Sequence, residues 1–379
     1  MKIALLTNDA REIRREYDLP NPYFGTAPSA LLDGFALLPE LEVHVVACWQ
    51  KPMPAPEKLA PNIWFHGLLV PKLGWLRTGY QGCIRAVRRK LQIVQPDIVH
   101  GQGTERDCSI SAVHSRFTNV LTIHGNMRLI ARVNRARPFS FEWLQARLES
   151  HTIPRSSGVV CITRYTQDAV RSLARATWVV PNAADASFFA IKPATLNPPL
   201  VLCVGQVCVR KNQNAFIRAL DSLAQRLRFQ VLFLSSPAND AYGKEFMELI
   251  AARSWCQFGG WASREDLKKH LARASFLALP SLEDNCPMVV IEAMAASVPV
   301  MAARVGGVPD LIEDNRTGLL FDPFNASDMA SAVEQLLIDK ELAARLAAAG
   351  KQEALARFHS VVIARQHLEI YREVLTRRS

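Results

Sequence analysis

The sequence predicts an α/β protein built from two Rossmann-like, doubly wound domains. Two observations lead to this prediction. Short apolar runs alternate with segments of helical spacing, and the whole alternation starts a second time near Leu200. The length agrees, because 379 residues exceed the ~100–200 residues that one domain commonly holds.

The predicted elements follow in order along the chain. The strand candidates of the first half are Ile3–Leu6, Val43–Ala47, Ile98–His100, Val120–His124 and Val159–Ile162, with helical spacing near 27–38, 76–93, 141–151 and 164–174. Those of the second half are Leu200–Gly205, Val231–Leu234, Gln257–Gly259, Phe276–Leu279 and Pro299–Ala302. The proline-containing stretch 180–199 predicts a boundary near residues 185–198, and a terminal helical tail is predicted from Ala354 onward.

Composition and charge narrow the classes of function. A formal net charge of +10 favours anionic partners, and nucleic acid is the least supported of them because no recognition motif is present. The N-terminal run is too short for a signal peptide, and no apolar stretch of ~18 residues predicts a transmembrane helix. Eight scattered cysteines without a Cys-x-x-Cys pair predict reduced core thiols of a cytoplasmic protein.

The segment after the strand Phe276–Leu279 holds the strongest functional signal. Glu283, Asp284 and Asn285 put polar groups where that strand ends, and Pro287 suits the first turn of a helix. The free N–H groups of a helix that starts just past a strand bind anions. An acidic loop beside an anion site predicts a ligand with both hydroxyls and phosphate, such as a nucleotide sugar. A helix that the acidic loop merely caps is the alternative.

This segment resembles the donor-binding signature of retaining glycosyltransferase family 4 (glycosyl transferases group 1), whose members have the GT-B fold. In the signature seven residues separate two acids, and the second is followed by Ala-Met-Ala; here the acids are Asp284 and Glu292. The family more often has Glu at the first position, so Asp284 is a shortened version. The resemblance implies that Asp284 lies near the donor sugar and that Glu292 binds the nucleotide ribose. Further donor contacts are implied at Asn285, Pro287, Met288 and Val289.

A second segment resembles the family's clamp for the donor diphosphate. The strand from Leu200 ends in Gly205, and Arg210 and Lys211 follow before the next helix. Lys211 matches the family's Lys, whereas Gln206 stands where the family has Arg. An amide donates a hydrogen bond but no charge, so Arg210 is the candidate that replaces the charge. A solvated Arg-Lys pair before a helix is the alternative.

The first half carries the candidates for the acceptor side. His124 ends the strand Val120–His124, and the resemblance implies that it faces the reaction centre. His100 ends the preceding strand and is interpreted as a wall or acceptor-side residue. Gly25 and Thr26 stand where the family has a Gly-rich loop, although Thr26 replaces one Gly. Purely structural roles for these residues remain the alternative.

A mixed basic and apolar face is predicted on the first domain. Its basic members are Arg77, Arg85, Arg88, Arg89 and Lys90, followed by Arg128, Arg132, Arg135 and Arg137. Phe139, Phe141 and Trp143 are among the apolar side chains interleaved with the second group. Such surfaces dock on anionic lipid, and a solvated helix face is the alternative.

The resemblance implies two facing domains with a central cleft. Residues 1–185 are expected to form the acceptor-side domain, residues 186–359 the donor-binding domain, and the terminal helix 360–379 is expected to cross back to the first domain. We expect no metal and no cofactor, because neither an Asp-x-Asp motif nor a His or Cys pair with ligand spacing occurs.

The expected function is therefore that of a retaining glycosyltransferase. It would move a sugar from a UDP- or GDP-sugar to a saccharide or lipid-linked saccharide acceptor, in polysaccharide, lipopolysaccharide or glycolipid assembly. His124, Lys211 and Asp284 are the catalytic candidates. The expected location is the cytoplasm, either free or peripheral on the inner face of the plasma membrane. The alternatives are a nucleotide-sugar 2-epimerase on a similar fold and a catalytically weak binding homologue; a dehydrogenase is disfavoured because Gly-x-Gly-x-x-Gly is missing.

Overall fold

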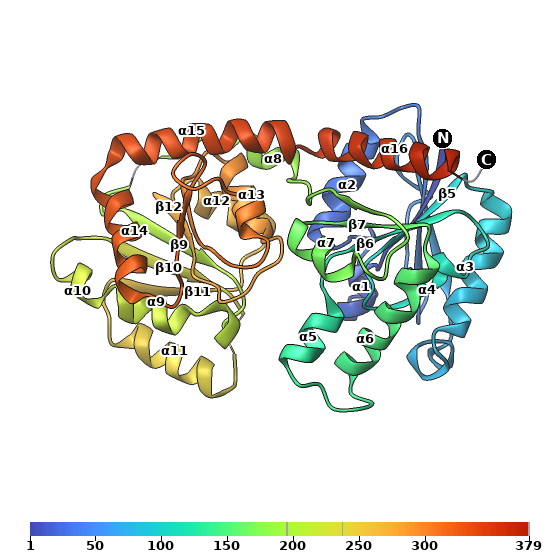
Figure 1. The fold of residues 1–379 in the computed structure, drawn as a ribbon, viewed down its shortest axis with the longest axis horizontal. Coiled ribbons are helices and arrows are strands. Elements are labelled where there is room, and N and C mark those ends of the chain that lie inside the picture. Colours follow the sequence, from blue (N-terminus) through green and yellow to red (C-terminus); the bar gives the residue numbers. More distant parts are fainter. Residues whose placement is uncertain (195, 237, 378–379) are drawn as a thin grey trace. The chain divides into compact units, whose positions relative to one another are not determined.

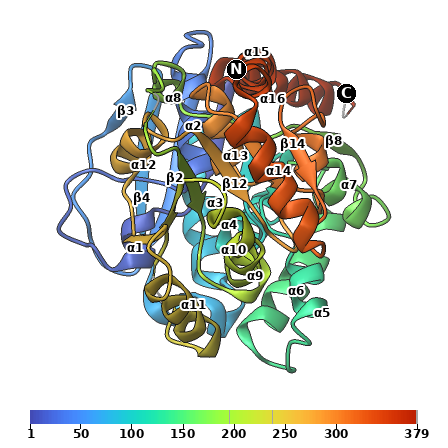
Figure 2. The same ribbon diagram turned by 90° about the vertical axis from the view of Figure 1, so that its left-hand side faces the viewer.

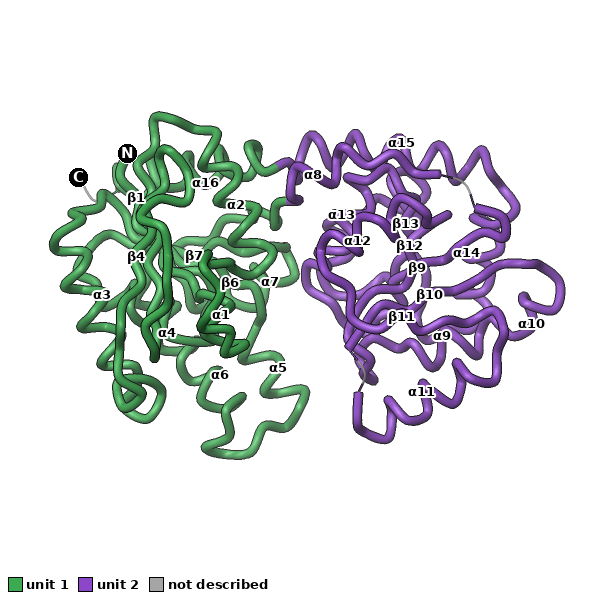
Figure 3. The backbone as a smooth tube through the Cα atoms, turned by 180° about the vertical axis from the view of Figure 1, so that it is seen from behind, with its two compact units in different colours: residues 1–183, 360–379 green, residues 184–359 purple. Residues whose placement is uncertain are grey.

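The computed structural model describes residues 1–377 except 195 and 237, and the chain divides into two compact units. Unit 1 comprises residues 1–183 together with the chain from 360 onward, and unit 2 comprises residues 184–359 (Figure 3). The chain passes from one unit to the other at 183/184 and again at 359/360. Residues 378–379 of the predicted tail lie outside the described residues. Each unit is a doubly wound α/β body, which confirms the predicted fold class.

Unit 1 is built on an eight-stranded sheet with the order β3-β4-β2-β1-β5-β6-β7-β8. All neighbouring strands are parallel except β3 and β4. The strands are β1 (Lys2–Leu6), β2 (Glu42–Trp49), β3 (Lys58–Ala60), β4 (Ile63–Leu69), β5 (Ile98–Gln102), β6 (Asn119–Ile123), β7 (Gly158–Cys161) and β8 (Thr177–Val179). The helices are α1 (Ala10–Arg14), α2 (Thr26–Ala36), α3 (Gln81–Val94), α4 (Asp107–Val113), α5 (Met127–Val133), α6 (Phe141–Thr152), α7 (Arg164–Val170) and α16 (Ser360–Thr376).

The C-terminal helix α16 packs into the core of unit 1 beside α2 (Figure 1). Phe35 of α2 and Tyr371 of α16 are both fully buried in one apolar cluster under the sheet. A Cβ at Gly34 would lie 2.2 Å from the carbonyl oxygen of Ser360, so only glycine permits this approach of the two helices. The terminal segment is therefore an integral part of unit 1.

Unit 2 is built on a six-stranded parallel sheet with the order β11-β10-β9-β12-β13-β14. The strands are β9 (Leu200–Val204), β10 (Gln230–Leu234), β11 (Cys256–Gly260), β12 (Phe276–Leu279), β13 (Val300–Ala303) and β14 (Leu319–Phe321). The helices are α8 (Ala186–Phe189), α9 (Gln213–Ala219), α10 (Asp221–Ala224), α11 (Ala241–Ala251), α12 (Arg264–Leu271), α13 (Met288–Ala295), α14 (Ala326–Ile338) and α15 (Lys340–Arg357). Figures 1 and 2 show α9 and α11 on one side of the sheet and α12 and α13 on the other.

The order of the strands in unit 2 reverses between β9 and β12. The chain builds outward from β9 to β10 and β11, then returns to the opposite side of β9 with β12, β13 and β14. Loops that leave such a reversal point diverge to opposite faces, and the crevice between them at the carboxyl ends of the strands binds ligands in this class of sheet. The two segments that carry the donor signature follow these two strands.

Sequence periodicity missed several elements of unit 1, namely β3, β4, β8, α1 and α4. Strand β4 is second from the edge of the sheet. Buried and half-exposed residues alternate in its first four positions, and the rest of the strand is half-exposed or exposed, so it forms no continuous apolar run. The predicted helix 76–93 is interrupted: Gly79 and Tyr80 both have left-handed backbone, with φ of 60° and 62°, so α3 begins only at Gln81. No helix within the described residues is both long and apolar enough to cross a membrane.

Candidate active site

The loops after β9 and β12 are joined by backbone hydrogen bonds. The N–H of Leu282 donates to the carbonyl oxygen of Arg210 at 2.7 Å. The guanidinium of Arg210 in turn donates to the carbonyl oxygen of Glu283 at 2.8 Å. The stem of Lys211 passes over Gly205, whose Cβ position lies 3.5 Å from the Lys211 Cδ atom. Two segments that lie about seventy residues apart in the sequence thus form one wall of the crevice.

Lys211 and Asp284 form an ion pair at the centre of this wall. The Lys211 Nζ atom donates to Asp284 Oδ2, and the Ser281 hydroxyl donates to the same oxygen at 3.2 Å. Arg210 lies 3.9 Å from the other oxygen of Asp284 and 3.6 Å from the Glu283 carboxylate. Burial raises the pKa of Glu283, and Arg210 opposes that shift. Two cations and two carboxylates therefore balance one another within the wall.

A glycine turn after β13 fixes the backbone of Asp284. The N–H of Gly307 donates to the carbonyl oxygen of Asp284 at 3.0 Å. Gly306 has φ +52°, and a Cβ there would lie 2.0 Å from the same carbonyl oxygen. The Gly-Gly turn is therefore required both by its left-handed backbone and by the close approach to Asp284. Three loops, after β9, β12 and β13, together place this carboxylate.

The start of α13 offers backbone N–H groups to an anion. Pro287 is the residue before its first turn, and its side chain makes no capping hydrogen bond. The half-buried residues Met288 and Val289 begin the helix, and Asn285 is half-buried in the loop before it. The first N–H groups of a helix and its dipole favour a negative group at this end. The wall thus combines side-chain cations with a helix start.

Glu292 belongs to a second charge cluster one turn further along α13. Its Oε1 atom accepts a hydrogen bond from Arg264 at 2.8 Å, and Arg264 also lies 3.8 Å from Asp185. Glu292 is only 2% exposed, and this burial raises its pKa while Arg264 lowers it. The guanidinium additionally lies over the ring of Phe188, 4.9 Å from its centroid.

Arg264 was missed by the sequence analysis although a signal was present. It is the first residue of α12, directly after Ser263, which caps that helix by accepting from the N–H of Asp266. The pattern Ser-x-x-Asp shortly after a strand marks a helix start at the carboxyl edge of the sheet. If every predicted helix start at this edge had been considered, Arg264 would have been among the candidate residues.

A cavity of about 390 Å³ adjoins the wall at the carboxyl ends of β9, β10 and β11. Gly205, the exposed Gln206, Ser235, Ser236 and Trp261 line it. The Trp261 side chain is 61% exposed. An aromatic face with a few polar groups around a cavity of this size is typical of small-molecule sites.

In unit 1, His124 follows β6 and hydrogen-bonds to Gln102. Its Nε2 atom lies 2.8 Å from Gln102 Oε1, and a second hydrogen bond links it to Asn182. The three residues line a cavity of about 10 Å³, room for one water molecule, together with Ala27 of α2. Desolvation lowers the pKa of His124 to about 4, so its imidazole is neutral at pH 7. Any contact it makes with a sugar is therefore that of an uncharged ring.

The structure corrects the position expected for His100. The side chain is 0% exposed and has no surface that an acceptor can reach in this conformation. Its Nδ1 and Nε2 atoms lie 2.6 Å from the Tyr371 hydroxyl and 2.7 Å from the Thr122 hydroxyl. His100 is the third residue of the central strand β5, so its side chain points into a covered face of the sheet and not to the edge.

Gly25 and Thr26 form the start of α2. Gly25 is the exposed residue that precedes the helix, and Thr26 is its half-buried first residue. Ala27, the next residue, borders the small cavity at His124. The structure thus places this turn near His124, and its contact with a ligand stays a prediction.

One group of potential metal ligands occurs within the described part of the chain. Cys48, Cys83 and Asp107 are buried in unit 1, and their ligand atoms all lie within 4.8 Å of one another. None of them belongs to the wall in unit 2. At that wall, positive charge comes from Arg210, Lys211 and the start of α13.

Comparison with known proteins places the chain in a family. The model of glycosyl transferases group 1 matches residues 185–353, and that of glycosyltransferase family 4 matches residues 37–188. The chain belongs to glycosyltransferase family 4. The two matched regions meet beside the division between the units; together they span residues 37–353, which include the whole sheet of unit 2 and every strand of unit 1 except β1.

Among its relatives is alpha-maltose-1-phosphate synthase of Mycolicibacterium smegmatis, 31% identical over 50% of this chain and 52% of that protein. Alpha-D-kanosaminyltransferase of Streptomyces kanamyceticus is 32% identical over 46% of each chain. A GDP-mannose-dependent mannosyltransferase of Mycobacterium tuberculosis is 29% identical over 42% of this chain and 44% of that protein. The chain thus spans about half the length of the curated relatives it matches.

Solved structures confirm the GT-B fold of this family 4 chain. Sucrose-phosphate synthase from Thermosynechococcus elongatus superposes with a TM-score of 0.79 over 99% of each chain, at 20% identity. Anabaena HepE in complex with UDP-glucose superposes with a TM-score of 0.69 over 98% of this chain and 100% of its own, at 18% identity. At these identities the likeness concerns the fold alone.

Replacing Gly306 tests whether the glycine turn holds Asp284. Gly306→Ala adds a Cβ 2.0 Å from the Asp284 carbonyl oxygen, whereas Gly260→Ala, at φ +70°, meets nothing within 4 Å. The control should cost only the left-handed strain, about 1–2 kcal/mol. Gly306→Ala should cost about 1–3 kcal/mol more through overlap. Urea unfolding of both variants measures the difference, and equal losses would show that the turn does not constrain Asp284.

Proposed function

We propose that this chain is a retaining glycosyltransferase that moves a sugar from a nucleoside diphosphate sugar to an acceptor hydroxyl. The observation that carries the proposal is the assembly of Arg210, Lys211, Asp284 and the start of α13 at the strand reversal of unit 2. Two comparisons add support. Anabaena HepE was solved with UDP-glucose, and the M. tuberculosis relative is named GDP-mannose-dependent.

The diphosphate is proposed to bind between Lys211, Arg210 and the first N–H groups of α13. Charge builds on the leaving phosphate as the glycosidic bond breaks, and positioned donors stabilise it most where water is excluded. Lys211 is suited to this, because only 13% of its side chain is exposed. It would exchange part of its contact with Asp284 for a phosphate oxygen. We propose that these groups act without a metal ion.

The nucleoside is proposed to fill the cavity of about 390 Å³ beside Gln206. The exposed ring of Trp261 offers an apolar face for the base, and Ser235 and Ser236 offer polar atoms. Glu292 is the proposed ribose partner. Its second oxygen is the atom for this contact, because Oε1 is already engaged with Arg264.

The transferred sugar is proposed to lie near Asp284 and Asn285, with His124 of unit 1 as a neutral contact. The family resemblance supports these roles and the retained anomeric configuration. A UDP- or GDP-sugar donor and a saccharide or lipid-linked acceptor of glycan assembly complete the proposal. No observation favours the epimerase alternative, whose signature would be conversion of the donor without an acceptor.

A double-mutant cycle that removes the charges of Lys211 and Asp284 distinguishes a chemical role of Lys211 from a structural one. Lys211→Met leaves the Asp284 carboxylate buried without its main partner, which costs up to about 3–5 kcal/mol. The double variant Lys211→Met with Asp284→Asn removes both charges and should fold. If Lys211 stabilises the leaving diphosphate, the double variant still turns over about 10²–10³-fold more slowly than Asp284→Asn alone. Equal rates of these two proteins would assign Lys211 a structural role.

The readout is release of UDP or GDP from the corresponding sugar nucleotides in the presence and absence of an acceptor mixture. Transfer requires that release depends on the acceptor, and product analysis by NMR reports the anomeric configuration. A chelator is expected to leave turnover unchanged. Conversion of the donor sugar without release of nucleotide would contradict the proposed function.

We further propose that the tip formed by α5 and α6 docks on anionic lipid. The two helices lie side by side and are joined by an exposed loop (Figure 1). At this tip Val133 and Phe139 are 71% and 81% exposed, and Arg132, Arg135 and Arg137 are exposed between them. Apolar side chains that enter the headgroup layer beside basic residues suit an anionic membrane.

Vesicle sedimentation checks the docking tip. The protein should pellet with phosphatidylglycerol-containing vesicles and not with pure phosphatidylcholine, and added salt should release it. Replacing Val133 and Phe139 by Ser should abolish binding, whereas Leu37→Ser, a 61% exposed leucine of unit 1 outside this tip, should not. Arg88 is unsuitable for such a test, because its guanidinium donates twice to the His114 carbonyl oxygen. Equal binding to both vesicle types would exclude the proposal.

A further inference from the structure

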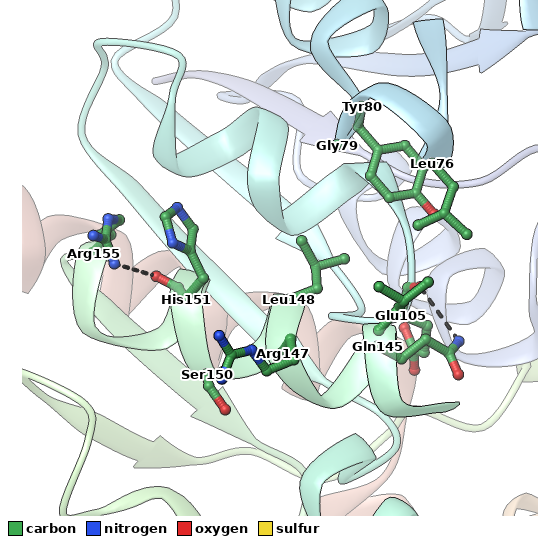
Figure 4. Close-up of a pocket in the computed structure, with 11 residues that line it drawn as sticks. Leu76, Gly79, Tyr80, Glu105, Gln145, Arg147, Leu148, Ser150, His151 and Arg155 are labelled. Atoms are coloured by element: carbon green, nitrogen blue, oxygen red, sulfur yellow. Dashed lines mark hydrogen bonds between the residues drawn. The ribbon is translucent and has the colours of Figure 1, made fainter. Parts of the chain in front are cut away.

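Unit 1 contains a cavity of about 540 Å³ between the start of α3 and helix α6 (Figure 4). Its volume falls within the range of ligand sites, roughly 300–1,000 Å³. Leu144 and Leu148 of α6 contribute an apolar wall. None of the residues predicted from the sequence as site residues lines this cavity.

Tyr80 offers an unused polar group to the cavity. Its side chain is 4% exposed, and its hydroxyl has no hydrogen-bond partner among the described residues. Figure 4 shows the hydroxyl pointing into the cavity, toward the side where Glu105 lies. Burial raises the pKa of Tyr80 well above its ordinary value, so the hydroxyl keeps its proton and can donate. The hydroxyl is therefore a donor that borders the cavity and is available to a ligand.

Glu105 connects the cavity to the loop after His124. Its carboxylate accepts a hydrogen bond from the N–H of Gly125, the residue next to His124. The Gln145 amide donates to the Glu105 carbonyl oxygen at 3.3 Å and fixes the backbone. Burial raises the pKa of Glu105, with Arg106 opposing the shift. A molecule in this cavity therefore lies beside the loop that carries the proposed sugar contact of unit 1.

Arg147 supplies positive charge on the opposite side of the cavity from Tyr80 (Figure 4). The guanidinium lies 5.3 Å from the centroid of the Trp143 ring, and it forms no ion pair within the described residues. Arg155 also lines the cavity and donates to the His151 carbonyl oxygen. Burial lowers the pKa of His151, so its imidazole is uncharged at pH 7 and the positive charges that line the cavity come from the two arginines.

We infer that this cavity binds the acceptor, and that the acceptor is a phosphorylated sugar or polyol. A hydroxyl of the acceptor would bridge Tyr80 and Glu105, and the phosphate would pair with Arg147, whose planar fork matches two phosphate oxygens. The inference rests on the proposed function, which assigns the acceptor to unit 1. The phosphate can belong to a soluble sugar phosphate or to a lipid head group.

Calorimetry on the full chain tests the inference, with glucose 6-phosphate, glucose 1-phosphate and glucose as probes and UDP or GDP present. Sugar phosphates should bind more tightly than glucose. Arg147→Gln should weaken their binding about 10- to 100-fold, the loss expected for a charge-assisted contact, and leave the response to glucose unchanged. Tyr80→Phe should weaken all three probes. Arg171→Gln, an exposed arginine of unit 1 outside the cavity, is the matched control.

A second arm distinguishes the sources of the phosphate. Phosphatidylinositol vesicles are compared with phosphatidylglycerol vesicles, using wild type and Arg147→Gln. If the protein prefers phosphatidylinositol vesicles and Arg147→Gln abolishes that preference, the acceptor is lipid-linked. If only the sugar phosphates bind in an Arg147-dependent way, the acceptor is soluble. Binding that is insensitive to Arg147→Gln and Tyr80→Phe, or no binding in either arm, overturns the inference. Binding of UDP and GDP is measured in the same samples. If neither nucleotide binds, the proposed function fails; if a nucleotide binds but no acceptor probe does, only this inference fails.

Discussion

The ion pair between Lys211 and Asp284 is the interaction on which the donor wall depends. It joins the loops after β9 and β12, and the glycine turn after β13 holds the Asp284 backbone from a third side. Both side chains are largely buried, so removing either partner leaves an uncompensated charge at the strand reversal. In the proposed function, a phosphate that binds at α13 would meet an ammonium that is already oriented by Asp284 and only 13% exposed.

The two units supply different chemistry to the proposed reaction. The wall in unit 2 is charged, with two cations and two carboxylates within one cluster. In unit 1, His124 and His367 line the same small cavity. Both imidazoles are neutral at pH 7, because desolvation lowers their pKa values to about 4. In the proposed reaction, stabilisation of the leaving diphosphate therefore belongs to unit 2. Unit 1 offers uncharged contacts near His124 and, in a separate cavity, Arg147 for the phosphate of the inferred acceptor.

The fold class and the donor segments could be predicted from sequence because both are local. Apolar runs define the parallel strands, and the acids, glycine and Lys211 follow directly after them. The partners could not be predicted, because pairing is a long-range property. Arg264 meets Glu292 from a different helix, Tyr80 turns into its cavity through a left-handed backbone, and the depth of His100 in the sheet depends on α16. A strand-end residue and a mid-strand residue look alike until register is known.

Hydrogen–deuterium exchange of the full chain with and without UDP or GDP tests most directly whether the strand reversal of unit 2 binds the donor. The account predicts that one of the nucleotides slows exchange in Gly205–Asn212, in Ser281–Val289 and around Gly307, because phosphate would bind the first amides of α13 and tighten the joined loops. Exchange in β14 should not change. Protection confined to other segments, or no protection by either nucleotide at saturating concentration, would contradict the account.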